Sequence, residues 1–406
     1  MARSEHRRIA IQGDAMTSID LIYFNAGGGH RAAALALEAV CREQQRPWDV
    51  RRVNLFEVLD PGDRFRRVTG MAPEELYNRR LEKGWTLGLA QELKLLQGMI
   101  RLGHATMVRR LRQHWLRTEP DLIVSLAPNF NRAMCQSAAE ALPGVPYVTV
   151  LTDLADFPPN FWIEPGLRQH LVCGTAAAVA QARAAGVPEG LIHPSSGMIV
   201  RPDFYRPPSI DRRAERERLG LDPDRPTGIV MFGAAGSLAM LDIAQQLDAV
   251  QLILMCGRHR TLPGELRQLA STAPRAIVEF TPEVRRHMAL ADFFIGKPGP
   301  GSLSEAAQQQ LPVLTFRNAW TLPQERYNAE WVRGNGLGLV VRSTRHLAAA
   351  VDELLQRLPE FQANVRSVRN RAVFEIPDIL ASVLADGGGG DHAKLVLNQG
   401  FAQAAV

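Results

Sequence analysis

The fold is decided by residues 20–30, DLIYFNAGGGH, which join a short apolar run to a cluster of glycines. Asp20–Phe24 predicts a buried strand, and the alanine-rich stretch from Arg31 predicts a helix directly behind the glycines. The same order recurs in residues 230–238, VMFGAAGSL, as a strand, a loop of small residues and a helix. Each half of the chain therefore contains the unit that opens a doubly wound α/β domain.

Apolar runs alternate with helical stretches along the rest of both halves. Further strands are predicted at 50–55, 122–126, 147–151 and 171–173 in the first half, and at 228–232, 252–256, 277–280, 293–295, 313–316 and 339–341 in the second. Continuous apolar strands separated by helices are typical of parallel sheets covered on both faces.

A segment rich in proline and charge, RPDFYRPPSIDRR at 201–213, separates the halves and has the character of a linker. We therefore expect two doubly wound α/β domains that face a cleft. The expected division is a first domain at 1–200, the linker at 201–213, a second domain at 214–385 and a fraying tail at 386–406.

Composition limits the class of protein. The 406 residues are 46% hydrophobic and 22% charged, as in a folded soluble protein, and no apolar run approaches a membrane span. The net charge of +5 is too small to argue for a nucleic-acid partner. The amino terminus does not resemble a secretory signal, and the four cysteines are far apart, which favours reduced thiols. We expect a cytoplasmic protein.

The first glycine loop, Gly27, Gly28 and Gly29, suits close approach of a ligand to the backbone, and the following helix start favours anionic oxygens. The loop loosely matches the dinucleotide fingerprint, but the acid expected about 20 residues later is missing, since the second strand ends near Asn54. His30 stands where the helix begins. It is a candidate base, and a capping or packed histidine is the alternative.

The second loop, between Gly233 and Ser237, leaves room for a pyrophosphate. Gly236 keeps the loop free of a side chain, and Ser237 can donate a hydrogen bond to the ligand. No Lys-Ser/Thr pair follows, so the loop is not a P-loop. A tight structural turn is the alternative.

The third motif, GKPGPGSLSEA at 296–306, is more specific, because a plain turn would not need Lys297, Ser302 and Glu305 together. Two prolines and three glycines predict a rigid turn between a strand and a helix. Glu305 falls one turn into that helix, where a carboxylate can accept both hydroxyls of a ribose.

The fourth motif, LPQERYNAEW at 322–331, places Gln324, Glu325 and Asn328 at one helix start. Gln324 and Asn328 are four residues apart, which predicts one shared helix face. Amides and a carboxylate suit the hydroxyls of a sugar, although an ordinary polar helix start would look the same.

We predict no metal site. The lone DxD motif, Asp222-Pro223-Asp224, stands just after the linker, where a proline turn is the simpler interpretation. Without a metal, helix dipoles, backbone amides and hydroxyls must stabilise the charge of a bound diphosphate.

Taken in order, GGGHRAA, VTVLTDL, SGMIVRPDF, MCGRHRTL, KPGPGSLSEA and PQERYNA resemble the monogalactosyldiacylglycerol synthases and processive diacylglycerol glucosyltransferases of glycosyltransferase family 28. The lipid-linked GlcNAc transferase of peptidoglycan synthesis is a relative of that family. The resemblance runs from about residue 22 to 341. It implies a GT-B fold, inversion at the anomeric carbon and a nucleotide sugar held mainly by the second domain.

The resemblance also implies roles for individual residues. It places Gly233, Gly236, Ser237, Pro300, Gly301 and Ser302 at the phosphates and Arg258 near the donor, where Lys297 and Gly299 are also expected. It places the backbone around Phe280 at the uracil, Glu305 at the ribose, and Gln324, Glu325 and Asn328 at the sugar, with His30 as the base. Asp153, in VTVLTDL, is expected to orient His30 or the acceptor, or else to be a helix cap or turn carboxylate.

One departure concerns the acceptor side. The family commonly has a histidine-tryptophan segment after its Thr-Asp, and this chain has ADFPPNFWIEPG at 155–166, with Phe161 and Trp162 but no histidine. The donor loop GAAGS is also less rich in glycine than is usual. Because the segment at 155–166 borders the expected acceptor side, the identity of the acceptor stays open.

The expected function is that of a hexosyltransferase that moves a hexose from a UDP-sugar, its substrate, to a membrane lipid such as diacylglycerol, without a further cofactor. The alternatives are a sugar-nucleotide epimerase of similar fold, an NAD-dependent oxidoreductase and an inactive nucleotide-sugar binder. The presence of both His30 and Glu305 argues against the last.

We expect the protein to bind its lipid acceptor at an anionic membrane surface on the cytoplasmic side. Residues 87–117 carry an apolar stripe at helical spacing, followed by arginines. These residues are Leu89, Leu93, Leu96 and Ile100, then Arg101, Arg109, Arg110, Arg112 and Arg117. A core-packed helix with a solvated edge is the alternative.

Overall fold

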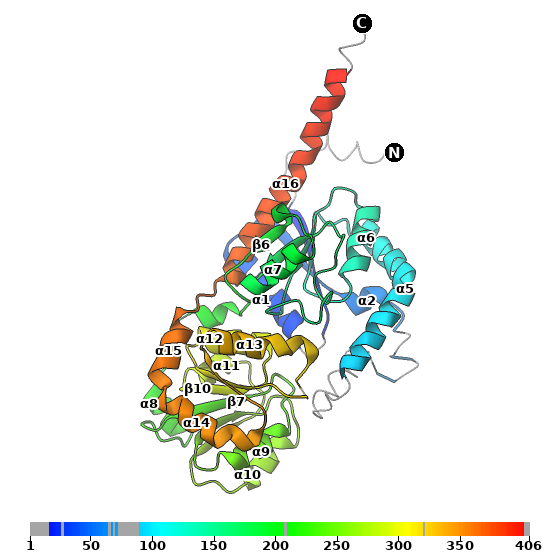
Figure 1. The fold of residues 1–406 in the computed structure, drawn as a ribbon. Helices are drawn as coiled ribbons and strands as arrows, with labels where there is room; N and C mark the ends of the chain where they lie inside the picture. Colours follow the sequence, from blue (N-terminus) through cyan, green and yellow to red (C-terminus); the bar gives the residue numbers. More distant parts are fainter. Residues whose placement is uncertain are drawn as a thin grey trace.

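The computed structural model describes residues 16–25, 28–63, 66–67, 70–71, 89–206, 209–319 and 321–401. Within them lie two parallel six-stranded sheets, with strand orders β2-β1-β3-β4-β5-β6 and β12-β11-β10-β7-β8-β9. Helices cover both faces of each sheet, and the two domains lie one above the other in Figure 1. The predicted pair of doubly wound α/β domains is confirmed.

The first sheet consists of β1 (Thr17–Tyr23), β2 (Trp48–Asn54), β3 (Leu122–Ser125), β4 (Tyr147–Val150), β5 (His170–Cys173) and β6 (Ile192–Pro194). Its helices are α1 (Gly29–Glu43), α2 (Leu55–Leu59), α5 (Leu89–Thr118), α6 (Asn131–Ala141) and α7 (Ala176–Ala184). Every strand predicted in this half overlaps an observed one. β6 was not predicted, because its three residues, IHP, carry almost no apolar signal.

The second sheet consists of β7 (Thr227–Met231), β8 (Gln251–Met255), β9 (Arg275–Val278), β10 (Phe293–Gly296), β11 (Val313–Phe316) and β12 (Gly338–Val341). Its helices are α8 (Arg212–Arg218), α9 (Ala239–Gln246), α10 (Leu262–Gln268), α11 (Val284–Met288), α12 (Pro300–Gln308), α13 (Arg326–Gly334), α14 (Leu347–Gln356) and α15 (Leu358–Ser367), with short 3-10 turns η3 (Pro323–Glu325) and η4 (Thr344–His346).

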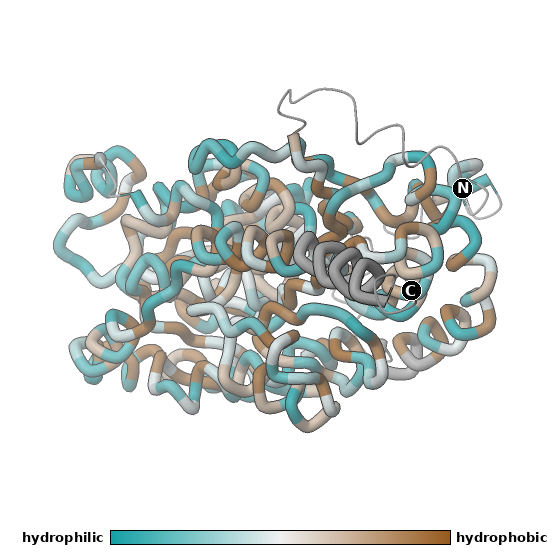
Figure 2. Tube along the Cα trace, turned by 90° about the horizontal axis from the view of Figure 1, so that it is seen from above, coloured by the Kyte–Doolittle hydropathy of each residue, from teal (hydrophilic) through white to brown (hydrophobic). Residues whose placement is uncertain are grey.

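Each sheet separates two apolar layers. In β1, Leu21 belongs to the layer under α1, whereas Ile22 belongs to the layer under α5 and α6. Side chains of successive strand residues point to opposite faces, so a strand buried on both sides must be apolar throughout. In Figure 2, apolar segments recur in the interior of the molecule and hydrophilic segments are common at its periphery.

The last helix, α16 (Ala372–Phe401), corrects the predicted domain boundary. Its residues Val373, Ile376, Leu380 and Val383 pack in the same layer as Leu37 of α1. Residues 372–385 therefore complete the core of the first domain, although the sequence analysis assigned them to the second. The helix also continues through the stretch predicted to fray from residue 386, and it projects beyond the first domain in Figure 1.

Candidate active site

A cavity of about 830 Å³ lies where the two domains face each other. The first domain contributes Asn25, Gly28 and Arg31, which belong to the first glycine loop and the start of α1. The second domain contributes the loop 233–237 and the segment around Lys297. Both glycine loops follow the carboxyl ends of strands, where doubly wound folds bind their ligands. Gly27 lies outside the described residues.

The loop after β7 approaches its neighbours too closely for side chains. Gly233 and Gly236 have φ values of 79° and 75°, which favour glycine. A Cβ on Gly236 would lie 2.2 Å from the carbonyl oxygen of Cys256. The Ser237 hydroxyl accepts a hydrogen bond from the Ala239 amide at 3.2 Å, which leaves its own hydrogen for a ligand. The loop thus presents backbone and one hydroxyl to the cavity.

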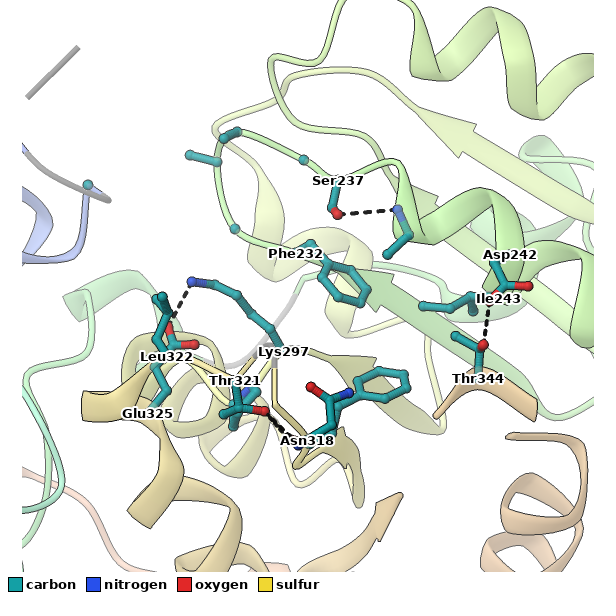
Figure 3. A pocket seen from close by; sticks show the side chains of 18 of the residues that line it. Phe232, Ser237, Asp242, Ile243, Lys297, Asn318, Thr321, Leu322, Glu325 and Thr344 are labelled. Carbon is teal, nitrogen blue, oxygen red and sulfur yellow. Dashed lines mark hydrogen bonds and ion pairs between the residues drawn. The ribbon is translucent and has the colours of Figure 1, made fainter. Parts of the chain in front are cut away.

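A partly buried ion pair stands at the cavity wall beside this loop. The Nζ of Lys297 lies 2.8 Å from Oε1 of Glu325, a residue only 6% exposed (Figure 3). The lysine side chain passes between Gly233 and Gly299, since its Cε lies 3.9 Å and 3.5 Å from where a Cβ would stand on them, which is van der Waals contact distance. Glu325, predicted to bind the sugar, contacts a cation in this structure.

Gln324 and Asn328 do not line this cavity. Asn328 has no exposed surface, and its amide donates a hydrogen bond to the Pro298 carbonyl at 2.8 Å. It therefore fixes the proline turn beside Lys297. Gln324 belongs to the 3-10 turn η3 and Asn328 to α13, so the two residues do not share one regular α-helix, and their contact with the sugar stays a prediction.

Glu305 also lies outside the cavity wall, with Pro300, Gly301 and Ser302 in the same helix, α12. Its Oε1 lies 3.6 Å from Nε of Arg201, at the start of the linker. Burial raises the pKa of Glu305 to about 7, and the charge of Arg201 partly offsets this effect. The structure therefore gives Glu305 an arginine partner and leaves its predicted contact with ribose a prediction.

Arg258 and Phe280 are brought together beside the second loop. The Arg258 guanidinium lies 4.0 Å from the centre of the Phe280 ring, which is 50% exposed. The Arg258 amide donates to the carbonyl of Ala234 at 2.9 Å and so ties this segment to the diphosphate loop. A guanidinium over an aromatic ring is a favourable contact. Because the Phe280 ring is half exposed, a ligand can replace it as the partner of Arg258.

His30 is half-buried beside the cavity, at the start of α1. Its Nδ1 lies 2.9 Å from Oγ1 of Thr152, and its ring centre lies 4.5 Å from that of Phe24 and 6.0 Å from that of Trp162. Burial lowers the pKa of His30 to about 4, against a smaller opposing effect of a hydrogen bond with the Leu126 backbone. The imidazole is neutral at pH 7 and can accept a proton.

Asp153 does not contact His30 through a hydrogen bond. Its Oδ2 accepts one from the indole Nε1 of Trp162 at 2.9 Å. Burial raises the pKa of Asp153 to about 7; the hydrogen bond from Trp162 and the charge of Lys297 lower it, and the charge of Glu325 raises it. The side-chain partner of His30 is Thr152, which the sequence analysis did not single out although it follows β4 at the cleft edge.

The segment with the missing histidine is a packed loop. Phe161 and Trp162 are 6% and 0% exposed, so they are core residues, and not part of an open acceptor surface. The carboxylate of Asp156 accepts hydrogen bonds from the backbone amides of Asn160 and Trp162, which fixes the loop.

The DxD motif is a surface turn. Arg213 pairs with Asp224 at 2.8 Å, and Asp222 accepts a hydrogen bond from the amide of Asp224. Both aspartates therefore have local partners.

Comparison with known proteins places this site in context. No family model matches the chain. A probable monogalactosyldiacylglycerol synthase of Glycine max is 26% identical over 385 residues, 90% of this chain and 71% of that protein. The Spinacia oleracea synthase is 25% identical, with 85% and 67% covered. A processive diacylglycerol beta-glucosyltransferase of Staphylococcus carnosus is 27% identical over 247 residues, 59% of this chain and 61% of that protein.

Solved structures agree on the fold. The S. aureus MnaA-UDP structure superposes with a TM-score of 0.58 at 15% identity, covering 91% of this chain and 97% of that one. The MurG of Acinetobacter baumannii superposes with a TM-score of 0.54 at 14% identity, covering 90% and 99%. The chain is thus a sequence relative of the monogalactosyldiacylglycerol synthases with the GT-B fold, as its motifs predicted.

Proposed function

We propose that this protein is an inverting glycosyltransferase that moves a hexose from a UDP-sugar to a membrane lipid such as diacylglycerol. The observation that carries the proposal is one cavity between the two glycine loops, with cationic side chains on one wall and a neutral histidine beside the other. The names of the sequence relatives support transfer and give no support to the epimerase or oxidoreductase alternatives.

On the donor side, the diphosphate would lie against the loop from Gly233 to Ser237, with the start of α9 behind it. Backbone amides and the helix dipole favour the negative charge that grows on the leaving group. Lys297 and Arg258 also line the cavity, and each would exchange its present contact for a phosphate oxygen. Together these groups would stabilise departing UDP.

On the acceptor side, an alcohol is a poor nucleophile until its proton is removed. In the proposed step, the acceptor oxygen attacks the anomeric carbon as its proton passes to His30. The bond from that carbon to the diphosphate oxygen breaks with its electron pair, and UDP leaves. A single displacement inverts the anomeric configuration, and the proton on His30 then passes to solvent.

The proposed membrane contact is the outer face of α5. Leu95, Met99 and Leu102, spaced four and three residues apart, are 64%, 54% and 90% exposed. The stripe predicted from the sequence is wrong, since Leu93 and Ile100 pack into the interior. Only Leu96 of that stripe is substantially exposed, and the side chain of Leu89 lies outside the described part.

Basic residues accompany this stripe along α5, and Arg109, seven residues after Leu102, lies on the same helix face. Arg101, Arg109 and Arg112 are exposed, whereas Arg110 donates a hydrogen bond to the Leu59 carbonyl. An apolar stripe beside arginines suits the boundary between acyl chains and anionic headgroups, each cation adding about 1 kcal/mol. None of the described helices combines the length and hydrophobicity of a membrane span. We therefore propose peripheral attachment on the cytoplasmic side.

Transfer is tested with radiolabelled UDP-glucose, UDP-galactose and UDP-GlcNAc presented with vesicles that contain diacylglycerol. The expected result is a labelled glycolipid from at least one donor, with release of UDP. An epimerised sugar nucleotide, or donor binding without a labelled lipid from any donor, would contradict the proposal.

Membrane attachment is tested by sedimentation with anionic and with neutral vesicles. Anionic vesicles are expected to bind more protein, and Leu102→Glu to reduce binding to them. Leu35→Glu is the matched control, because Leu35 is an exposed leucine on α1, 41% exposed and away from α5. Equal binding to both vesicle types, unchanged by salt, would exclude an electrostatic contribution.

A further inference from the structure

We propose that Thr152 is the positioning residue of the reaction: its hydroxyl holds Nδ1 of His30 so that Nε2 is the nitrogen that receives the acceptor's proton. The inference rests on the proposed function, with His30 as the base, and assigns a role to a residue outside the donor motifs.

The contact is built into the first sheet. Thr152 follows β4 and is only 8% exposed, and its Oγ1 lies 2.9 Å from Nδ1 of His30. Phe24 and Trp162 stand against the same imidazole, with ring centres 4.5 Å and 6.0 Å away. Two aromatic rings restrict the plane of the imidazole, and its orientation in that plane is fixed by the Thr152 hydroxyl together with the Leu126 backbone, which also hydrogen-bonds His30.

The direction of the hydrogen bond between Thr152 and His30 determines the tautomer. A neutral imidazole carries one N–H and one bare nitrogen, and a threonine hydroxyl can accept from the first or donate to the second. When Nδ1–H donates to Thr152, Nε2 keeps its lone pair for a substrate proton. When Thr152 donates to Nδ1, the proton lies on Nε2 and the ring cannot act as the base. Proton transfer in the proposed step therefore requires Thr152 to be the acceptor.

The neighbouring carboxylate is engaged elsewhere. Asp153 accepts its hydrogen bond from the Trp162 indole, at 2.9 Å, and no hydrogen bond joins it to His30 in the described structure. A hydroxyl, unlike a carboxylate, adds no negative charge beside the ring, so a protonated His30 is little stabilised. The proton it takes would therefore pass readily to solvent, which resets the base for the next cycle.

The test compares Thr152→Val, which removes the hydroxyl at nearly constant volume, with Thr152→Ser, which keeps it. The control is Thr149→Val, because Thr149 is a fully buried threonine of β4 whose Oγ1 bonds Gln169 at 2.8 Å, away from His30. Thr152→Val is expected to lower kcat about 10-fold or more with KM for the UDP-sugar nearly unchanged. Thr152→Ser is expected to stay within about 3-fold of wild type.

The tautomer itself is read from ¹⁵N chemical shifts of labelled histidine side chains, with His30→Ala used to assign the resonance. Wild type and Thr152→Ser are expected to show the Nδ1–H form, and Thr152→Val to gain the Nε2–H form. This measurement needs no turnover. If the wild-type protein transfers no sugar, the proposed function is wrong. The ¹⁵N measurement still tests whether Thr152 holds the tautomer of His30.

Three results would overturn the inference. They are a wild-type His30 in the Nε2–H form, an unchanged kcat in Thr152→Val, and a loss of kcat in Thr149→Val as large as that in Thr152→Val. The last would show that the hydroxyl matters only for folding.

Discussion

Lowering the pH from 8 to 5.5 tests which side chain accepts the acceptor's proton, because the two candidates titrate in different ranges. Burial lowers the pKa of His30 to about 4 and raises that of Asp153 to about 7. A general base must be unprotonated to act, so the rate falls as the pH drops through the pKa of the base. The two assignments therefore predict different profiles.

The size of the difference follows from the two values. At pH 5.5 a histidine with a pKa of about 4 is still roughly 97% unprotonated, whereas a carboxyl group with a pKa of about 7 is only about 3% ionised. With His30 as the base, kcat should be almost constant from pH 8 to 5.5. With Asp153 as the base, kcat should fall about 30-fold over the same range.

The assay is the initial rate of UDP release at saturating donor and lipid and at constant ionic strength. A return of each sample to pH 8 shows whether the enzyme has stayed folded. His30→Ala is expected to lower kcat about 100-fold or more at pH 8, with UDP affinity nearly unchanged. A wild-type kcat that falls through a midpoint near pH 7, with the same midpoint in the residual activity of His30→Ala and full recovery at pH 8, would refute the assignment of His30.

Three further predictions concern the donor site and stability. Glu305→Ala should weaken UDP binding by about 1.5–3 kcal/mol in calorimetric titration, and equal affinities would make Glu305 a structural residue. Lys297→Gln should lower kcat by about 10-fold or more, since a cation that stabilises the leaving diphosphate is lost; an unchanged kcat would remove Lys297 from the chemical step. Burial lowers the pKa of His30, His114 and His170 to about 4, so their contribution to stability is complete above pH 6.5 and is lost as the pH falls toward 4. Urea unfolding at pH 7 and pH 5 should show the decline, and a free energy of unfolding equal at both values would contradict it.

The features predictable from the sequence are those that a local pattern encodes. The strand, glycine loop and helix from Asp20 to His30 fix their own conformation, because an apolar run must be buried and glycines permit the turn. Since parallel strands end at one edge, the two loops were also predicted to meet at a cleft, where the cavity now lies.

Contacts between distant segments were not predictable in this way. The pair of Lys297 with Glu325 and the bond of His30 with Thr152 join residues 28 and 122 positions apart, and no spacing rule covers either. Helical spacing likewise fits two stripes on α5, since Leu93 and Ile100 repeat as regularly as Leu95 and Leu102. Only the packing of the neighbouring elements shows which stripe is buried.

The return of α16 to the first sheet has a consequence for how the chain is made. During synthesis the ribosome releases β1 and α1 long before Ala372, so a hydrophobic layer of the first domain waits uncovered while the second domain emerges. The first domain can complete its core only after α16 has left the exit tunnel. A nascent chain stalled before residue 372 should therefore hold a folded second domain beside an unfinished first one that chaperones recognise.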